Sequence, residues 1–297
     1  MTTLHRGAAA RPAVDRSLAT FGWLVFAFLY LPIVLVVALS FSRSESVGRW
    51  GGFSLRWYEQ MLGNDQLLNA LWNSVVVALI STLVATVLGT AAALSLDRYR
   101  RWVGRGAFDG LLYLPIIIPD VTMAVMLLLW FTQTGVVALG RGSITLAHIA
   151  FNISFVAIVV RARLAHMDPA MEDAAADLYA NRWQRFRRVT LPLIMPGVLG
   201  GALLALTLSL DDVVITSFVQ GPGSTTLPVY VFGLIRRTVT PVINAVSTVM
   251  IVVSMVLVLT SLVFQRRSEK SNLRRMKEDE TPICAAGRPC IGGGRMR

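Results

Sequence analysis

Residues 168–192 read DPAMEDAAADLYANRWQRFRRVTLP, and this polar stretch separates two long apolar segments of the chain. Asp168 followed by Pro169 is a typical helix start, because Asp caps the first free amides and Pro fits the first turn. A turn near Asn181 and a second, basic helix are expected before the next apolar segment. The stretch therefore predicts two short helices joined by a turn, lying between two membrane-spanning segments.

Apolar segments long enough to cross a bilayer occur on both sides of this stretch. About 20 apolar residues in a helix cross the hydrocarbon core, and lipid-exposed backbone must bond within its own helix. The chain has 297 residues, of which 55% are hydrophobic and only 15% charged, which excludes a lone water-soluble domain and a disordered chain. We therefore expect an all-α membrane protein with six transmembrane helices. The six segments are 20–42, 69–94, 107–132, 144–164, 192–220 and 243–265.

Two prolines interrupt the third of these segments. Pro115 and Pro119 both lie in its first half, and proline inside a helix removes a backbone donor and clashes with the preceding turn. We expect a kinked or broken helix at this point.

The distribution of basic residues predicts that both termini are cytoplasmic. With the N-terminus inside, 22 of the 28 Lys and Arg residues fall on the inner side and six on the outer side. Cytoplasmic loops of membrane proteins are enriched in Lys and Arg, so the net charge of +11 does not indicate a nucleic-acid partner. The predicted division is an N-terminal cytoplasmic segment 1–19, a first helix with its outer loop 20–68, a core 69–265 containing the loop 165–190, and a disordered cytoplasmic tail 266–297.

Residue types that carry covalent or metal chemistry are scarce. The two lysines, Lys270 and Lys277, follow the last apolar segment, and the sequence contains no phosphate-binding G-x-x-x-x-G-K-[ST] loop. The two cysteines, Cys284 and Cys290, lie in the tail with a spacing that fits neither a redox nor a zinc pair. Three histidines are too scattered to indicate a metal site: His5, His148 and His166. We expect no catalytic residue, metal site or cofactor in this chain.

The spacing within the polar stretch resembles the EAA motif of ABC-importer permeases, which reads E-A-A, three residues, Gly, nine residues, Ile, one residue and Leu-Pro. Asp173-Ala174-Ala175 takes the place of E-A-A, Val189 that of Ile, and Leu191-Pro192 that of Leu-Pro. Tyr179 stands where the motif has Gly. If that Gly permits a left-handed turn, Tyr179 must carry strain or the chain must bend elsewhere. Spacing alone also fits an amphipathic helix that merely lies on the membrane surface.

The resemblance implies that this stretch docks on a separate ATPase subunit, which would hold the ATP and Mg. It also implies a second permease subunit, a periplasmic substrate-binding protein and the lipid of a bacterial inner membrane as partners. The implied ATPase-coupling residues are Glu172, Asp173, Ala174, Ala175, Asp177, Leu178 and Tyr179.

Other segments resemble the spermidine/putrescine branch of these permeases, and the resemblance to a permease core covers most of the chain from Asn69 to Phe264. The segments are 52–58 (GFSLRWY), Pro119-Asp120, 209–214 (SLDDVV), 221–228 (GPGSTTLP) and 241–245 (PVINA).

Three carboxylates are expected near the middle of the membrane. Asp120 lies in the third apolar segment and Asp211 and Asp212 in the fifth, and ionisable groups at this depth are functional candidates. A substrate pathway lined by them would suit a small polycation. They also fit a structural role, bonded at helix breaks or protonated by desolvation. Because neighbours on a helix point 100° apart, one of Asp211 and Asp212 should face another helix.

The sequence therefore predicts a permease subunit of an ATP-driven importer, with polyamines as the substrate class. An ATPase-independent cation channel, an ion-coupled carrier and an ABC permease for another substrate are the alternatives. The sequence does not decide which polyamine is carried, or whether the permease pair is homo- or heterodimeric.

Overall fold

The computed structural model describes residues 12–99, 101–168, 170–237, 240–256 and 258–260. These residues are helical, apart from turns and one isolated β-bridge between Ser42 and Phe53. The predicted tail 266–297, with both cysteines, lies outside the described residues, as do residues 1–11.

Within the described residues, five helices are long and apolar enough to cross a membrane, and there are six spans if a bent pair of helices is counted as one. Each of the six overlaps one of the six apolar segments, so the all-helical membrane fold is confirmed. The single helices are Leu18–Ser40 within α1 (Pro12–Ser40), α3 (Asp65–Arg98), α6 (Arg141–Leu164), the run Arg182–Asp211, and Val242–Thr260. The short helices outside the spans include α2 (Arg56–Leu62), α7 (Ala170–Asp177) and α11 (Leu227–Arg237).

The third span is broken, as its prolines predicted. It consists of α4 (Arg105–Ile117) and α5 (Asp120–Thr134), which meet at an angle of 113°. Ile118 and Pro119 between them are extended, with ψ of 132° and 138°, because the residue before a proline is pushed out of the helical region. Pro115 is accommodated inside α4, so the break belongs to Pro119.

The fifth span has other bounds than the apolar segment 192–220 expected from sequence. It begins earlier, with α8 (Arg182–Arg185) and a π-helical turn η1 (Phe186–Thr190) leading into α9 (Leu191–Asp211). The helix then stops at Asp212, which is extended, and the short helix α10 (Val214–Val219) follows. The apolar segment 192–220 thus contains a helix break, because Asp212 ends one helix and its side chain accepts from the first free amides of the next.

The chain divides into two compact units. Of the described residues, the first contains those within 12–65 and 233–252, and in it the indole of Trp57 donates a hydrogen bond to the Ser42 carbonyl at 2.7 Å. Asn244 reaches the Val47 carbonyl at 3.3 Å. These bonds hold the loop between α1 and α2 in a defined conformation.

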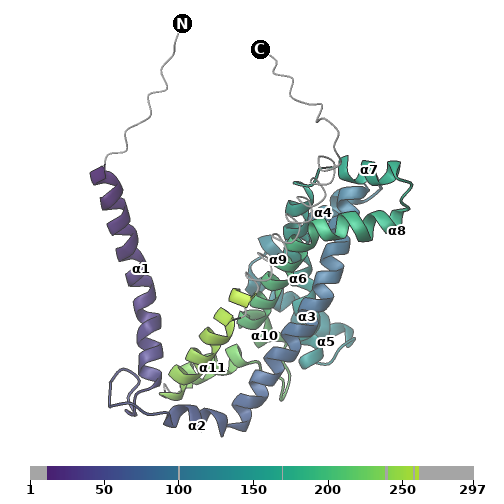
Figure 1. Ribbon diagram of the computed structural model, residues 1–297. Coiled ribbons are helices and arrows are strands. Elements are labelled where there is room, and N and C mark those ends of the chain that lie inside the picture. The colour runs from purple at the N-terminus through teal and green to yellow at the C-terminus, as the bar shows by residue number, and fades with distance from the viewer. Residues whose placement is uncertain (1–11, 100, 169, 238–239, 257, 261–297) are drawn as a thin grey trace. The chain divides into compact units, whose positions relative to one another are not determined.

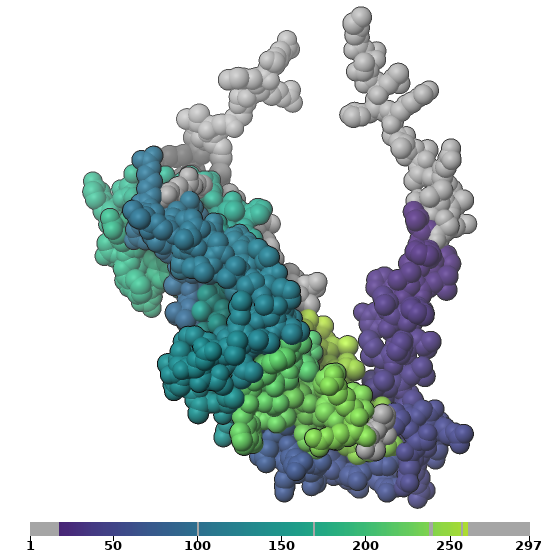
Figure 2. Space-filling model, turned by 180° about the vertical axis from the view of Figure 1, so that it is seen from behind, coloured from purple at the N-terminus to yellow at the C-terminus, as the bar shows by residue number. Residues whose placement is uncertain are grey.

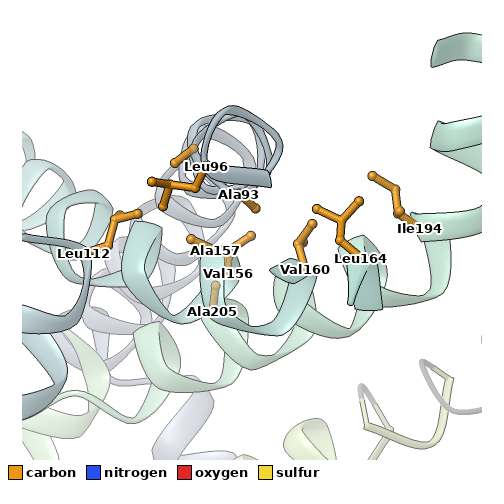
Figure 3. Packing of buried hydrophobic residues seen from close by; sticks show 10 residues of the cluster. Ala93, Leu96, Leu112, Val156, Ala157, Val160, Leu164, Ile194 and Ala205 are labelled. Atoms are coloured by element: carbon orange, nitrogen blue, oxygen red, sulfur yellow. The ribbon is translucent and has the colours of Figure 1, made fainter. Parts of the chain in front are cut away.

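The second unit contains residues 66–232 and is built around α6, which packs extensively against α9 and also contacts α4 (Figure 1). One apolar cluster draws side chains from α3, α4, α6 and α9 (Figure 3). In the space-filling view, the teal residues of α5 lie beside green residues of the last third of the chain (Figure 2), in agreement with the contacts between α5 and α10. The labelled members of the cluster are Ala93, Leu96, Leu112, Val156, Ala157, Val160, Leu164, Ile194 and Ala205.

Glycines allow the helices of this unit to approach closely. A Cβ on Gly89 of α3 would lie 2.8 Å from the Ile153 carbonyl oxygen, and one on Gly197 of α9 would lie 2.7 Å from Cβ of Arg163. In a lipid bilayer the hydrophobic effect does not drive helices together, so their association depends on close packing. Small residues permit that packing because the helix backbones can approach each other closely.

Polar side chains also join α3 to distant parts of the chain. The hydroxyls of Ser81 and Ser209 are 3.1 Å apart, and both residues are buried. Nearer the start of α3, the Asn73 amide donates to the carbonyls of Gly223 and Thr225, each at 3.1 Å. Asn73 and Ser81 of this span are therefore bonded to segments that follow much later in the sequence.

Candidate functional site

The two broken spans meet at a cavity of about 330 Å³. Asp120, the first residue of α5, and Asp211 and Asp212, at the end of α9, all line it. The structure thus brings together the three carboxylates singled out from sequence. The aromatic rings of Phe151 and Phe155 on α6 form part of the same lining.

Asp212 is held by its surroundings. One carboxylate oxygen accepts hydrogen bonds from the backbone amide and the hydroxyl of Thr216, both at 2.7 Å, and the other accepts from the Ile215 amide at 3.2 Å. These bonds satisfy the free amides at the start of α10. Asp212 therefore has a structural task at the break, and it is the member of the pair that faces other helices.

His148 on α6 completes this arrangement, and sequence reasoning missed it. Its side chain is fully buried, with Nδ1 2.6 Å from the Ser209 hydroxyl and Nε2 3.0 Å from the Thr216 hydroxyl. The same Nε2 lies 3.3 Å from Asp212, so a group that can carry positive charge does lie beside these carboxylates. The sequence did contain a sign of this role. His148 is an ionisable residue within an apolar segment, and an ionisable side chain inside the membrane needs a hydrogen-bonding or charged partner.

Asp120 and Asp211 differ from Asp212. Both are exposed in the isolated chain, and within the described residues neither carboxylate has a hydrogen bond or ion pair in the structure. Asp211 also ends α9, and Pro115 in the last turn of α4 lines the cavity. The cavity lies between the C-terminal ends of α4 and α9 and the N-terminal ends of α5 and α10, whose partial charges are opposite, so its negative charge comes from the two free carboxylates. This electrostatic setting favours a cation.

The loop that resembles the EAA motif is anchored through Glu172 of α7. Its carboxylate accepts hydrogen bonds from the Arg98 guanidinium at 2.9 Å and from the Thr190 hydroxyl at 2.5 Å. Arg98 also donates to the Thr190 hydroxyl at 2.9 Å. Glu172 therefore faces the body of the unit and joins α7 to the end of α3 and to η1.

The start of α7 has the geometry that the sequence predicted. Asp168 accepts a hydrogen bond from the Ala170 amide at 3.0 Å, and Asn181 caps α8 through the Gln184 amide at 2.8 Å. Pro169 lies outside the described residues.

The end of α7 places the unusual motif residue in a left-handed conformation. Tyr179 has a φ of 58° and is the one non-glycine residue with positive φ in the described part of the chain. The Ala180 amide bonds the Ala175 carbonyl at 3.1 Å and the Tyr179 amide bonds the Ala176 carbonyl at 2.9 Å, which is the Schellman pattern. The expected strain therefore falls on Tyr179, at the motif's Gly position.

Apolar and small side chains of this loop remain uncovered. Tyr179 and Leu178 are 97% and 82% exposed. The implied coupling residues Asp173, Ala174 and Asp177 are also exposed, while Ala175 is half-buried. Exposed apolar groups beside small residues are typical of a protein–protein contact.

Comparisons with known proteins agree with this architecture. The family described as "Binding-protein-dependent transport system inner membrane component" matches residues 85–274. The spermidine/putrescine transport system permease protein PotC of Haemophilus influenzae is 40% identical over 248 residues, covering 84% of this chain and 96% of that protein. The putrescine transport system permease protein PotI of Escherichia coli is 40% identical over 255 residues, covering 84% and 90%.

Solved structures show the same fold at low identity. A chain of a bacterial ABC transporter involved in the import of the acidic polysaccharide alginate has a TM-score of 0.67 at 20% identity, covering 86% of this chain and 98% of that one. A chain of the MetNI methionine ABC transporter has a TM-score of 0.60 at 16% identity, covering 71% and 98%. With the sequence matches, these likenesses show that the chain belongs to the family of binding-protein-dependent transport system inner membrane components.

Proposed function

We propose that this chain is a membrane-spanning permease subunit of an ATP-driven importer of polyamines such as putrescine and spermidine. The observation that carries the proposal is the cavity at which two broken spans present Asp120 and Asp211, each without a partner within the described residues. The 40% identity to spermidine/putrescine permeases supports the same substrate class.

The cavity can attract a linear polycation in two ways. The carboxylates of Asp120 and Asp211 attract ammonium groups. Phe151 and Phe155 offer apolar surface to the methylene chain and ring faces to the charged ends. Asp212 supports this site by holding the helix break rather than by meeting the substrate.

Transport would be driven through α7. In this proposal the exposed residues Asp173, Ala174, Asp177, Leu178 and Tyr179, with Ala175, dock on the ATPase, which binds ATP and Mg. Glu172 would transmit a displacement of α7, because its carboxylate is hydrogen-bonded to Arg98 at the end of α3 and to Thr190 in η1. The η1 turn continues into α9, and α9 ends at Asp211 in the cavity. A displacement of α7 is thus linked to the acidic site by one continuous helical run.

The proposal includes the surroundings of the subunit. Both termini are cytoplasmic, the protein lies in a bacterial inner membrane, and it works with a second, related permease chain and a periplasmic binding protein. The predicted division at residues 19, 68 and 265 is kept. No covalent step occurs on this chain, since ATP hydrolysis belongs to the partner.

Reconstitution tests the proposal. The chain is co-expressed with its partner permease and ATPase, the periplasmic binding protein is added, and uptake of labelled putrescine into proteoliposomes is measured with and without ATP. We expect ATP-dependent uptake that falls at least tenfold in Asp120→Asn and Asp211→Asn, at equal protein level. Asp65→Asn, an exposed carboxyl outside the cavity, is the matched control and should leave uptake unchanged. Uptake without ATP would indicate a channel or carrier instead.

Docking on the ATPase is tested separately. Ala174→Arg places a long charged side chain on the exposed face of α7 and should prevent co-purification of the ATPase without affecting membrane insertion. Ala165→Arg, also exposed but outside α7, is the control. Retention of the ATPase by Ala174→Arg at wild-type stoichiometry would contradict the docking role.

A further inference from the structure

An arginine-lined pocket of about 270 Å³ lies where the end of α3 meets α7 and α8. Its lining consists of Arg98, Tyr99, Glu172, Arg182 and Arg185. Glu172 is already bonded to Arg98 and Thr190. Within the described residues, Arg182 and Arg185 have no ion pair, and Nε of Arg185 is buried without a hydrogen-bond partner. The pocket therefore holds two guanidinium groups that no carboxylate neutralises.

The pocket lies at one end of two spans. Arg98 is the last residue of one span and Arg182 the first residue of another, and α7 lies beside them. Tyr99 and Trp183 nearby are 63% and 65% exposed, which is typical of aromatic residues at a membrane interface. On the proposed orientation, this is the interface of the cytoplasmic leaflet.

We propose that this pocket binds the phosphate of an anionic phospholipid. The planar guanidinium of Arg presents paired N–H donors that match phosphate oxygens, and basic pockets between spans at this level bind acidic head groups. Arg182 and Arg185 supply the free charge, while Arg98 and Tyr99 supply further donors from α3. A free phosphate offers the same oxygens, but the flanking apolar spans and interfacial aromatics favour one that carries acyl chains.

A lipid in this position would join elements that the coupling loop depends on. Its phosphate would connect the end of α3 to α8, on the side of the pocket where Glu172 anchors α7. Anionic lipid would thus help to hold α7 in place. Binding itself does not depend on which substrate is carried, so it can fail or succeed independently of the proposed polyamine transport.

Native mass spectrometry of the purified full-length chain tests the proposal. Retention of phosphatidylglycerol and of zwitterionic phosphatidylcholine is compared in a neutral detergent. The test variant is Arg182→Gln/Arg185→Gln, and the matched control is Arg187→Gln/Arg188→Gln, which removes two exposed arginines of the same segment that do not line the pocket. We expect wild type and control to retain phosphatidylglycerol selectively and the test variant to retain about tenfold less.

The other possible results of this experiment each bear on the lipid proposal. Equal loss in both double variants would overturn the pocket in favour of general surface charge. Competition by millimolar inorganic phosphate that displaces the lipid completely would identify a free-phosphate site and overturn the lipid assignment. Lack of selective lipid binding in wild type, with ATPase binding lost in the test variant, would mean that the arginines meet an acidic side chain of the ATPase. If Arg182→Gln/Arg185→Gln elutes as an aggregate, Arg182→Lys/Arg185→Lys replaces it and should show weakened but still selective binding.

Discussion

Nε2 of His148 lies 3.3 Å from a carboxylate oxygen of Asp212, at the point where α9 gives way to α10. The next residue in the chain, Asp211, lines the same cavity with its carboxylate exposed. Two adjacent carboxyl groups therefore differ in surroundings. One is committed to a buried network and a helix cap, and the other is available to a cation.

Because of this difference, replacing Asp by Asn should reduce stability at one position and transport at the other. Asp212→Asn loses an acceptor for the amides of α10 and leaves buried partners unsatisfied, so we expect a loss of about 1–3 kcal/mol in stability. Asp211→Asn should unfold at the wild-type temperature and lose transport only. Thermal unfolding of the purified variants in detergent separates them, and equal unfolding temperatures would contradict the structural role of Asp212.

Close packing at Gly89 gives a second prediction. Gly89→Ala places a methyl group 2.8 Å from the Ile153 carbonyl oxygen, so α3 and α6 must move apart at a cost of about 1–3 kcal/mol. Gly110→Ala is the control, because a Cβ there meets nothing within 4 Å and alanine favours α4. The resistance of each variant to thermal aggregation measures the difference, and similar behaviour of the two would refute the close contact.

Replacing Tyr179 should change the stability of the turn and the affinity for the ATPase in opposite directions. Tyr179→Gly removes the strain of a left-handed non-glycine residue, about 1 kcal/mol, and should slow hydrogen exchange at the Ala180 amide that closes the turn. Affinity for the ATPase should nevertheless fall, because an aromatic side chain that is 97% exposed is lost from the docking face. Unchanged exchange at Ala180 would show that the turn is not strained.

The proposed orientation predicts which cysteines an impermeant thiol reagent reaches. In a background without Cys284 and Cys290, Ser46→Cys and Gln133→Cys should react from outside intact cells, and Arg187→Cys should react only after permeabilisation. All three positions are exposed in the structure. Labelling in the reverse order would place the termini outside.

Much of the fold could be predicted from the sequence, because it depends on signals within each segment. Apolar runs locate the spans, and Pro119 marks the break between α4 and α5. The break at Asp212 carried no such signal, since neither proline nor glycine interrupts residues 202–220. It depends on hydrogen bonds that form only once the chain turns back on itself, so periodicity could not reveal it.

The candidate site, like the fold, could be predicted only in part from the sequence. The three acidic residues could be selected because charge in an apolar segment is costly, and the structure places all three at one cavity. Their separate tasks could not be assigned, because His148 and Asp212 are partners only in three dimensions. For the same reason the resemblance could name Glu172 only as a coupling residue, and its hydrogen bonds to Arg98 and Thr190 are seen only in the structure.

The hydrogen bond between Ser81 and Ser209 spans 128 residues of sequence, and this separation has a consequence for biosynthesis. At about 5–20 residues per second, a ribosome needs roughly ten seconds to make the partner of Ser81 after α3 has been released. During that interval the Ser81 hydroxyl and the Asn73 amide lack their final hydrogen-bond partners. We expect the nascent chain to stay at the insertion machinery until residues 209–225 emerge, and truncation before residue 209 should leave α3 exposed to membrane proteases.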